Sequence, residues 1–300
     1  MEINKKGQWL EIQVPPEWNG LTIEYILRNI YHVPKNLLHQ LRMNNGVLVN
    51  KEKVSWSRNL GTNEKLQLLL FIEEDYGVEP EYKDLEILYE DDHILIVNKP
   101  AGIDTHPTDK GQLGTLANAV AFHLQLSGIK TKIRHIHRID RDTTGAVLFA
   151  KEKLSGAILD RRLEKREIKR TYITLVHGLM KQKSGKIDAP IGRDRHHPTR
   201  RRVSPTGQSA VSFYKVLKYD KKNSTTLVEL ELQTGRTHQI RVHMSHLGHP
   251  LVGDVLYGGK KIFSRQALHA AKIKLSHPIT DEHIECIAPL PDSFSIFTNK

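Results

Sequence analysis

Hydrophobic and polar positions follow one pattern before residue 75 and another after residue 86. In the first part, helical spacing recurs in "TIEYILRNI" and "NLLHQLRMNN". Short strands are predicted in "GVLVNKEKV", around an Asn-Lys-Glu turn, and in "KLQLLLF". Two helices and a few strands in about 65 residues bury only a small core. We therefore predict a small α/β module over residues 1–75 that depends on contact with a partner or a ligand for its stability.

The second part reads mainly as consecutive strands. A polar segment over residues 76–85 contains Gly and Pro and is the predicted linker. Helices are predicted in "TLANAVAFHLQLSG" and "LSGAILDRRLEKREI". Predicted strands include "LEILY", "HILIVNK", "GAVLFAK", "RTYITLVHG", "SAVSFYKVLKYD", "STTLVELELQ", "ALHAAKIKLSH" and "HIECIAP". Because strands that follow one another pair most readily antiparallel, we predict an α+β domain over residues 86–300 with a mixed, largely antiparallel sheet.

The composition is that of an ordinary globular protein, with 38% hydrophobic residues. No apolar run approaches the ~18 residues of a membrane-spanning helix, so we expect no membrane association. The start "MEINKKGQWLEI" has no apolar signal region, and the only cysteine, Cys286, cannot form an internal disulfide. These features favour a cytoplasmic protein. The absence of a coiled-coil pattern or an apolar stripe favours a monomer.

The formal charge of +11 is concentrated in one part of the chain. Residues 161–202 hold fourteen Lys and Arg against four Asp and Glu, an excess of ten positive charges. A solvated helix face followed by a basic loop is one explanation. The basic clusters, however, fall in separate predicted elements. If they converge on one face, they suit the phosphate backbone of a nucleic acid.

The stretch "HRIDRDTTG" places charges beside a predicted buried strand. In an extended backbone, Arg138, Asp140 and Asp142 would face one side. "DTTG" is typical of a turn, so Asp142 is expected to cap that turn. Asp140 is not needed there and lies between two arginines, which keep its carboxylate ionised. Asp140 is therefore a candidate nucleophile or general base, although spacing alone does not decide this.

Two further stretches contain candidate chemistry. In "LQTGRTHQIRVHMSHLGHPLVGDVLYG", a helix is predicted to start at a Thr237 cap, which places His238 and Arg241 on one face. Its histidines also raise the possibility of zinc, but H-E-x-x-H spacing and a cysteine pair are missing, so we expect no metal. Tyr172 opens a strand after a basic helix. It is either a core residue or a stacking platform for a base.

Taken together, "HRIDRDTTG", "KRTYITLVHG" and "TGRTHQIRVHMSHLGHPLVGD", with "VNKPAGIDTHP" upstream, resemble the RluA-type family of RNA pseudouridine synthases in order and spacing. The resemblance covers roughly residues 86–292 and implies the fold of that family. The N-terminal module resembles a small RNA-binding domain shared with a ribosomal protein. It departs from the usual pattern at "GTNEKL" and "HVPKN".

The resemblance implies isomerisation of uridine to pseudouridine in structured RNA, without a cofactor. It assigns the essential aspartate to Asp140, the active-site tyrosine to Tyr172 and the basic partner of the aspartate to Arg241. Arg236 is kept as a second candidate for that partner. The predicted substrate-binding residues are Arg138, Arg236, His238, Lys99, His106, Thr144, Arg200, Arg201 and Arg202.

The expected substrate is large-subunit ribosomal RNA, with tRNA as the alternative. Two other functions stay open from the sequence. One is a non-catalytic RNA-binding or ribosome-assembly protein that has kept the fold. The other is a zinc-dependent hydrolase that uses the histidine-rich helix.

Overall fold

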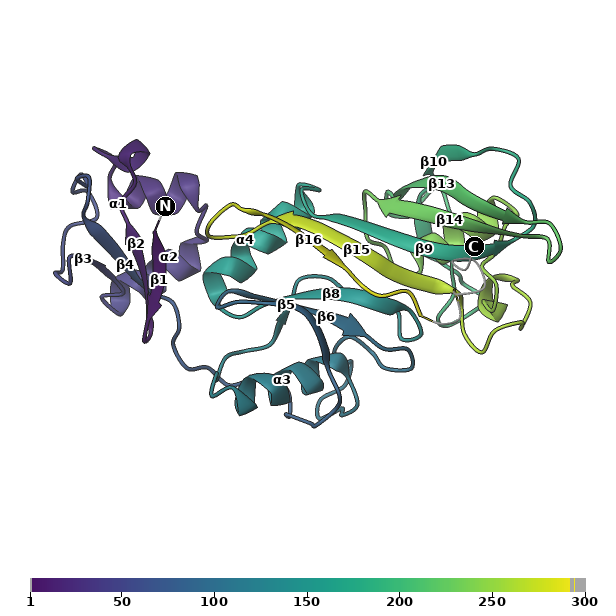
Figure 1. The fold of residues 1–300 in the computed structure, drawn as a ribbon, viewed down its shortest axis with the longest axis horizontal. Coiled ribbons are helices and arrows are strands. Elements are labelled where there is room, and N and C mark those ends of the chain that lie inside the picture. Colours follow the sequence, from purple (N-terminus) through teal and green to yellow (C-terminus); the bar gives the residue numbers. More distant parts are fainter. Residues whose placement is uncertain (1, 292–293, 295–300) are drawn as a thin grey trace.

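The computed structural model describes residues 2–291 and residue 294. Its strands form a four-stranded sheet, a ten-stranded sheet and a separate two-stranded hairpin. Figure 1 shows the small sheet at one end of an elongated molecule and the large sheet along the rest. This arrangement separates the N-terminal part of the chain from the part that contains the three candidate stretches.

The small sheet has the strand order β1-β2-β4-β3. Its strands are β1 (Ile3–Lys6), β2 (Trp9–Gln13), β3 (Val47–Val49) and β4 (Lys65–Leu69). The helical segments beside it are η1 (Pro16–Trp18), α1 (Ile23–Tyr25), the π-helical η2 (Ile26–Ile30) and α2 (Lys35–Met43). Thr22 caps α1, because its hydroxyl accepts a hydrogen bond from the backbone N–H of Tyr25. Both helical predictions and the β4 prediction are confirmed.

One prediction in this part is wrong. The stretch "GVLVNKEKV" supplies only β3, because Val49 and Glu52 close a tight turn through a single bridge. After that turn the chain does not run back along β3. Instead β3 pairs with β4, in a register that places Val47 opposite Leu68. Strands β1 and β2 were not predicted.

The large sheet has the order β10-β13-β14-β9-β15-β8-β6-β5, with β16 paired to β15 and β7 to β8. Its strands are β5 (Glu86–Glu90), β6 (Ile94–Lys99), β7 (Arg134–His135), β8 (Thr144–Ala150), β9 (Lys169–His177), β10 (Ser184–Asp188), β13 (Val211–Asp220), β14 (Thr225–Leu232), β15 (Leu268–Ser276) and β16 (His283–Ile287). Only the β8–β15 pair is parallel; the other pairs are antiparallel. The predicted mixed, largely antiparallel sheet is confirmed.

Helices cover both faces of the part of this sheet that contains β6 and β8. They are α3 (Leu116–Leu126) and α4 (Lys153–Glu164), while α5 (Gln239–His246) follows β14. Along β6, Leu95 and Val97 pack in the core that contains α3, and Ile94 and Ile96 pack in the core that contains α4. Such burial on both faces explains the continuous apolar run of this strand. The core around α3 also contains Tyr172 of β9 and residues of α5, so one face of the sheet carries the candidate stretches.

The N-terminal module packs against α4. Leu154 and Ile158 of this helix belong to the hydrophobic core of the small sheet. Glu74, near the end of the module, forms ion pairs with Arg134 and Lys153. The two parts are therefore in direct apolar and charged contact. The division into a module over 1–75, a linker over 76–85 and a catalytic domain over 86–300 stays a prediction.

The single cysteine and the expected lack of a membrane-spanning segment can both be compared with the structure. Cys286 lies in β16 and is buried. Among residues 2–291 and 294, no helix combines the length and the apolar character needed to cross a bilayer.

Candidate active site

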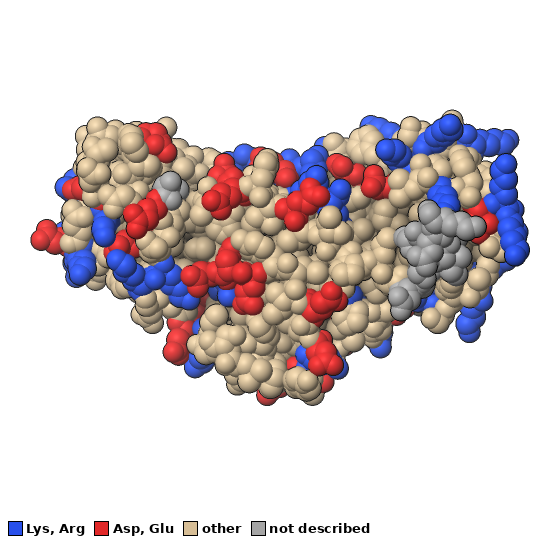
Figure 2. Space-filling view, in the orientation of Figure 1, with Lys and Arg blue, Asp and Glu red and all other residues tan. Residues whose placement is uncertain are grey.

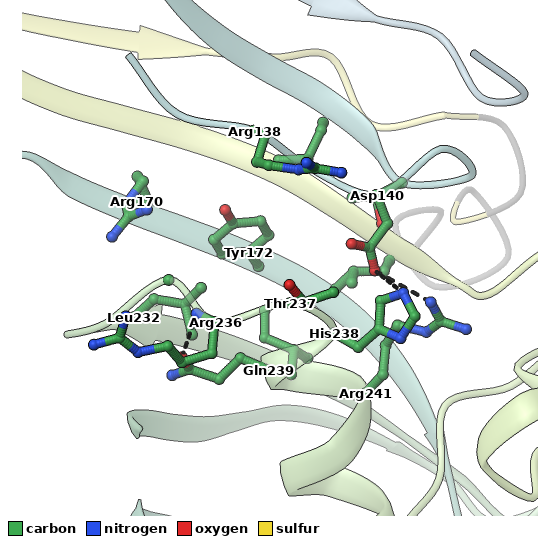
Figure 3. A pocket seen from close by; sticks show the side chains of 15 residues that line it. Arg138, Asp140, Arg170, Tyr172, Leu232, Arg236, Thr237, His238, Gln239 and Arg241 are labelled. Carbon is green, nitrogen blue, oxygen red and sulfur yellow. Dashed lines mark hydrogen bonds and ion pairs between the residues drawn. The ribbon is translucent and has the colours of Figure 1, made fainter. Parts of the chain in front are cut away.

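The three candidate stretches meet around one pocket (Figure 3). The pocket encloses about 580 Å³ of space, counted to its open mouth. Its lining residues are Arg138, Ile139, Asp140, Thr143, Arg170, Tyr172, Leu232, Gly235, Arg236, Thr237, His238, Gln239, Ile240, Arg241 and Leu268. They come from the loop before β8, the start of β9, the end of β14 with the segment that leads from it into the first turn of α5, and the first residue of β15. The fold therefore gathers groups that are more than a hundred residues apart.

The loop that carries Asp140 is fixed by a neighbouring loop. The buried hydroxyl of Thr105 donates to the carbonyl of Ile139 and accepts from the N–H of Ile139. The ammonium of Lys99 donates to three carbonyls, those of Pro100, Ile103 and Arg141, each at 2.8 Å. These bonds hold the backbone on both sides of Asp140, which orients its carboxylate.

Lys99 is fully buried and outside the pocket lining, so the structure gives it a supporting place and no direct access to substrate. Burial lowers the pKa of Lys99 to about 8. We predict that Lys99→Met destabilises the protein by about 1–3 kcal/mol, because three carbonyls lose a charged donor. Urea unfolding measures this, with exposed Lys110→Met as the matched control. Equal stability of the two variants would contradict the supporting role.

Arg241 connects Asp140 to a second, buried aspartate. Its Nη1 lies 3.2 Å from Oδ2 of Asp140, while Nε and Nη2 lie 2.7 and 2.9 Å from the two carboxylate oxygens of Asp254. Burial alone would lower the pKa of Arg241, but the hydrogen bonds and charges of Asp254 and Asp140 outweigh it and raise this pKa. The guanidinium is therefore ionised, held from behind, and presents one N–H group to Asp140.

His238 approaches the same carboxylate oxygen of Asp140 as Arg241 does. Its Nε2 lies 4.0 Å from Oδ2 of Asp140, and its Nδ1 lies 2.8 Å from the hydroxyl oxygen of Tyr257. That hydroxyl accepts from the N–H of Arg201, so it donates its own proton to Nδ1. Burial lowers the pKa of His238. A neutral ring with its proton on Nε2 therefore faces Asp140.

Tyr172 lies on the floor of the pocket and is 4% exposed. None of the described residues forms a hydrogen bond with its hydroxyl. Burial raises the pKa of Tyr172, so the phenol keeps its proton at neutral pH. An aromatic ring with a free hydroxyl beside an aspartate can support a base by stacking and can hold or pass a proton.

Asp140, Tyr172 and Arg241 lie within residues 93–246, which match the model of the family described as RNA pseudouridylate synthase. The chain belongs to the RNA pseudouridine synthase family. The predicted family, fold and enzyme class are thereby confirmed, and RNA is the substrate of this synthase. A second model, described as the N-terminal domain of the RluD ribosomal pseudouridine synthase, matches residues 10–66.

Relatives of the synthase cover most of its length. The uncharacterized RNA pseudouridine synthase YhcT of Bacillus subtilis is 49% identical, over 96% of both chains. The ribosomal large subunit pseudouridine synthase D of Haemophilus ducreyi is 39% identical, over 83% of this chain and 79% of that protein. The solved structure of human RNA pseudouridylate synthase domain containing 1 covers 74% of this chain and 90% of its own, with 26% identity and a TM-score of 0.59.

Several predicted substrate-binding residues of the synthase do not line the pocket. Asp140, Tyr172, Arg241, Arg138, Arg236 and His238 do, whereas Lys99, His106, Thr144, Arg200, Arg201 and Arg202 do not. His106 stacks on His135 with ring centroids 4.2 Å apart, and the hydroxyl of Thr144 bonds Nδ1 of His269. Arg200 pairs with Asp194. Arg202 is exposed, on the strand β12 (Arg201–Val203).

Arg236 was the second candidate partner of Asp140, and its geometry does not support that role. Its Nε donates to the carbonyl of Ser209, whereas Arg241 is the arginine bonded to Asp140. Arg236 and Arg201 instead line a neighbouring hollow together with Arg193 of the strand β11 (Ile191–Arg193). These three cations suit phosphate groups of a bound RNA.

Two predicted caps are wrong. Helix α5 begins at Gln239 with His238 at its N-cap, in a left-handed conformation with φ of 59° and no side-chain cap. Thr237 therefore does not cap it. The side-chain oxygen of Gln239 accepts the N–H of Arg236 instead. The carboxylate of Asp142 accepts no hydrogen bond from the described residues, and its turn is closed by the hydrogen bond from the N–H of Thr143 to the carbonyl of Asp140. The backbone carbonyl of Asp142 accepts from the guanidinium of Arg265.

The histidines near α5 serve the packing of the synthase. His243 bonds Ser212 and the carbonyl of Ala189, and His249 bonds the carbonyl of His177. Among the described residues, no group of three His, Cys, Asp or Glu side chains is placed to hold a metal ion. Nothing in this geometry supports the zinc-hydrolase alternative.

Reasoning from the sequence missed two residues of the site, Asp254 and Arg170. Asp254 stands in the quoted stretch "GDVLYG", but thirteen residues separate it from Arg241 and no periodicity joins the two. Arg170 stands two positions before Tyr172 in the quoted stretch "KRTYITLVHG". Its alternation with Tyr172 along a strand was the available signal, since both then face the same side.

Proposed function

We propose that this synthase isomerises specific uridines of large-subunit ribosomal RNA, with Asp140 as the catalytic aspartate. The observation that carries the proposal is the aspartate at the wall of an open pocket, bonded to a guanidinium that is itself fixed by Asp254. Arg241 holds the carboxylate of Asp140 in position through a charge-assisted hydrogen bond. The ring of Tyr172 supports the uracil by stacking, and its hydroxyl holds or passes a proton.

The chemistry needs one carboxylate and no external reagent. The bond between N1 and C1′ breaks, a bond between C5 and C1′ forms, the proton on C5 leaves, and N1 gains a proton. Atoms and electrons balance without oxidation or hydrolysis, so the proposal includes no cofactor. A single anionic carboxylate, attacking either the sugar or the base, is sufficient to start this sequence.

The target uridine must leave its stack to reach Asp140, which costs roughly a few kcal/mol. Basic side chains at the pocket mouth offset this cost by binding phosphates. Arg138 and Arg236 are exposed there, and the hollow lined by Arg193, Arg201 and Arg236 continues from the pocket. Figure 2 shows that Lys and Arg also gather on the end of the molecule that holds β10 and β13.

Two observations support ribosomal RNA as the substrate. Several relatives bear the name ribosomal large subunit pseudouridine synthase D. The small N-terminal module matches the N-terminal domain of a ribosomal pseudouridine synthase. We accordingly include residues 1–75 as an RNA-binding module, residues 76–85 as its linker and residues 86–300 as the catalytic domain of a monomeric, cytoplasmic enzyme.

Pseudouridine mapping of total RNA, from cells with and without the gene, tests the proposal. We expect one or a few uridines of large-subunit rRNA to lose their modification in the deletion strain. The wild-type gene should restore them and an Asp140→Asn gene should not. Loss confined to tRNA would move the substrate to tRNA. An unchanged pseudouridine map, with a ribosome defect rescued by Asp140→Asn, would establish the non-catalytic alternative.

A further inference from the structure

Among the residues that the structure describes, Arg170 is a buried cation without a counter-ion. Its side chain lines the active pocket, the residue is only 8% exposed, and its Nε is buried without a hydrogen-bond partner. Within the described part of the chain, no carboxylate pairs with it and no group bonds its guanidinium. Arg241, in the same pocket, is bonded to two aspartates. The contrast marks Arg170 as a group whose partner is missing from the folded protein.

Burying the Nε–H group of Arg170 without a partner is costly, because its hydration is lost and nothing replaces it. The chain nevertheless makes room for it. A Cβ atom on Gly235 would lie 3.0 Å from Nη1 of Arg170, so a larger residue there would press on the guanidinium. A donor kept free, with space around it, inside a substrate pocket suits a group that the substrate brings.

The position of Arg170 relative to Tyr172 and Asp140 determines which part of the substrate it can contact. Arg170 and Tyr172 are two residues apart on β9, so they face the same side and lie about 7 Å apart along the strand. Figure 3 shows the ring of Tyr172 between Arg170 and Asp140. A uracil ring stacked on Tyr172, with C1′ near Asp140, extends away from Asp140. Its far end is C4 with the carbonyl oxygen O4.

We propose that Arg170 donates a hydrogen bond to O4 of the flipped uracil and stabilises the negative charge that the base acquires during the reaction. This inference rests on the proposed function of Asp140. When the bond between N1 and C1′ breaks, its electron pair goes to the base and spreads onto O2 and O4. If Asp140 instead adds to C6, the same oxygen O4 receives the charge. A fixed cation at O4 is favourable in both cases.

The same contact selects uridine over cytidine. A guanidinium is a donor only, so it pairs with a carbonyl oxygen. Cytosine carries an amino group at this position, which is also a donor. Arg170 would then face N–H groups, and its charge would stay unsatisfied in a buried place.

A backbone phosphate is the other anion that an arginine could bind. The exposed arginines at the mouth, Arg138 and Arg236, are placed for phosphates. Arg170 lies inside, beside the buried ring of Tyr172 and opposite the apolar Leu232. Burial therefore favours the base over the backbone as its partner.

The test compares Arg170→Met with Lys169→Met. Lys169 precedes it on β9, is about half exposed and pairs with Glu231, so its substitution removes the same charge outside the pocket. The substrate is a synthetic stem–loop that contains the uridine identified by mapping, with either uridine or 4-thiouridine at that position. Sulfur is a poorer hydrogen-bond acceptor than oxygen. Single-turnover rates, RNA affinity and thermal stability are measured for each enzyme.

We expect Arg170→Met to slow pseudouridine formation on uridine by about 10²–10³-fold. The RNA affinity of Arg170→Met should match that of Lys169→Met. Its thermal stability should be equal to or higher than that of Lys169→Met. On 4-thiouridine the rate ratio between wild type and Arg170→Met should fall below about tenfold, because the contact is already weakened. Arg170→Lys should regain part of the rate, since it restores a charged donor.

Other outcomes overturn the inference. An equal rate ratio on both RNAs means that Arg170 does not contact O4. Weaker RNA binding with a shallower salt dependence means that it binds a phosphate. A lower melting temperature with no separate rate defect means that it is only structural. If Asp140→Asn is inactive while Arg170→Met behaves like Lys169→Met, this inference fails and the proposed function stands.

Discussion

Asp140→Asn should reduce the single-turnover rate of pseudouridine formation by at least about 10⁴-fold, the scale seen when a reacting group is removed from an enzyme. The amide keeps the shape of the carboxylate, but it is neither a nucleophile nor a base at neutral pH. Folding should survive, because Arg241 is still held by Asp254 through Nε and Nη2. RNA affinity should change only a few-fold, since Asp140 carries none of the phosphate contacts.

Asp142→Asn is the matched control for this prediction. It makes the same chemical change two residues away, on a carboxylate that neither lines the pocket nor accepts a side-chain hydrogen bond from the described residues. Turnover by this control should stay within a few-fold of wild type. Turnover by Asp140→Asn at the level of the control would remove Asp140 from the chemistry.

Arg241→Ala should abolish turnover and also destabilise the fold by roughly 3–5 kcal/mol. The stability loss comes mainly from Asp254, which is 2% exposed and would be left as a buried anion without its bidentate partner. Urea unfolding and single-turnover kinetics measure the two effects separately. Arg236→Ala is the control for the stability loss only, because Arg236 is exposed and its guanidinium bonds only the carbonyl of Ser209 among the described residues.

A double variant separates folding from catalysis at this pair. Replacing both Arg241 and Asp254, as Arg241→Met with Asp254→Leu, removes the buried anion together with its cation. Most of the lost stability should return, because apolar groups of similar volume replace a buried ion pair at little cost. Turnover should stay absent, since Asp140 has lost the group that aims it. If Arg241→Met alone were as stable as wild type, the buried carboxylate of Asp254 would not depend on Arg241 for its stability.

Secondary structure was predictable where apolar runs are long. The strands β6, β8, β9, β14 and β15 are buried over most of their length, so their continuous hydrophobic character identified them. Strands β7, β10, β11 and β12 have two to five residues with few buried positions, and they were missed. In such strands the pairing partner, and not the local pattern, decides the structure.

Residue types in the site were also predictable, whereas their contacts were not. An arginine-flanked aspartate, a tyrosine at a strand start and a basic helix are visible in the sequence and, through the family resemblance, in their roles. Lys99 and Thr144 were placed at the substrate because they stand in the same motifs. In the structure both side chains point into the protein, because Lys99 ends β6 and Thr144 begins β8, and a motif does not show which way a side chain at a strand end turns.

The sequence by itself determined the chemistry available to this protein, namely the candidate carboxylate, the donors around it and an excess of positive charge that suits RNA. It also determined most of the strands that build the sheet. The tertiary structure alone decided that Arg241 and not Arg236 meets Asp140, that Asp254 holds Arg241, and that Arg170 finds no partner among the described residues. The physical reason is that charge pairing and burial depend on distances between segments far apart in the chain. Those distances are set by sheet order and packing, which no local pattern encodes.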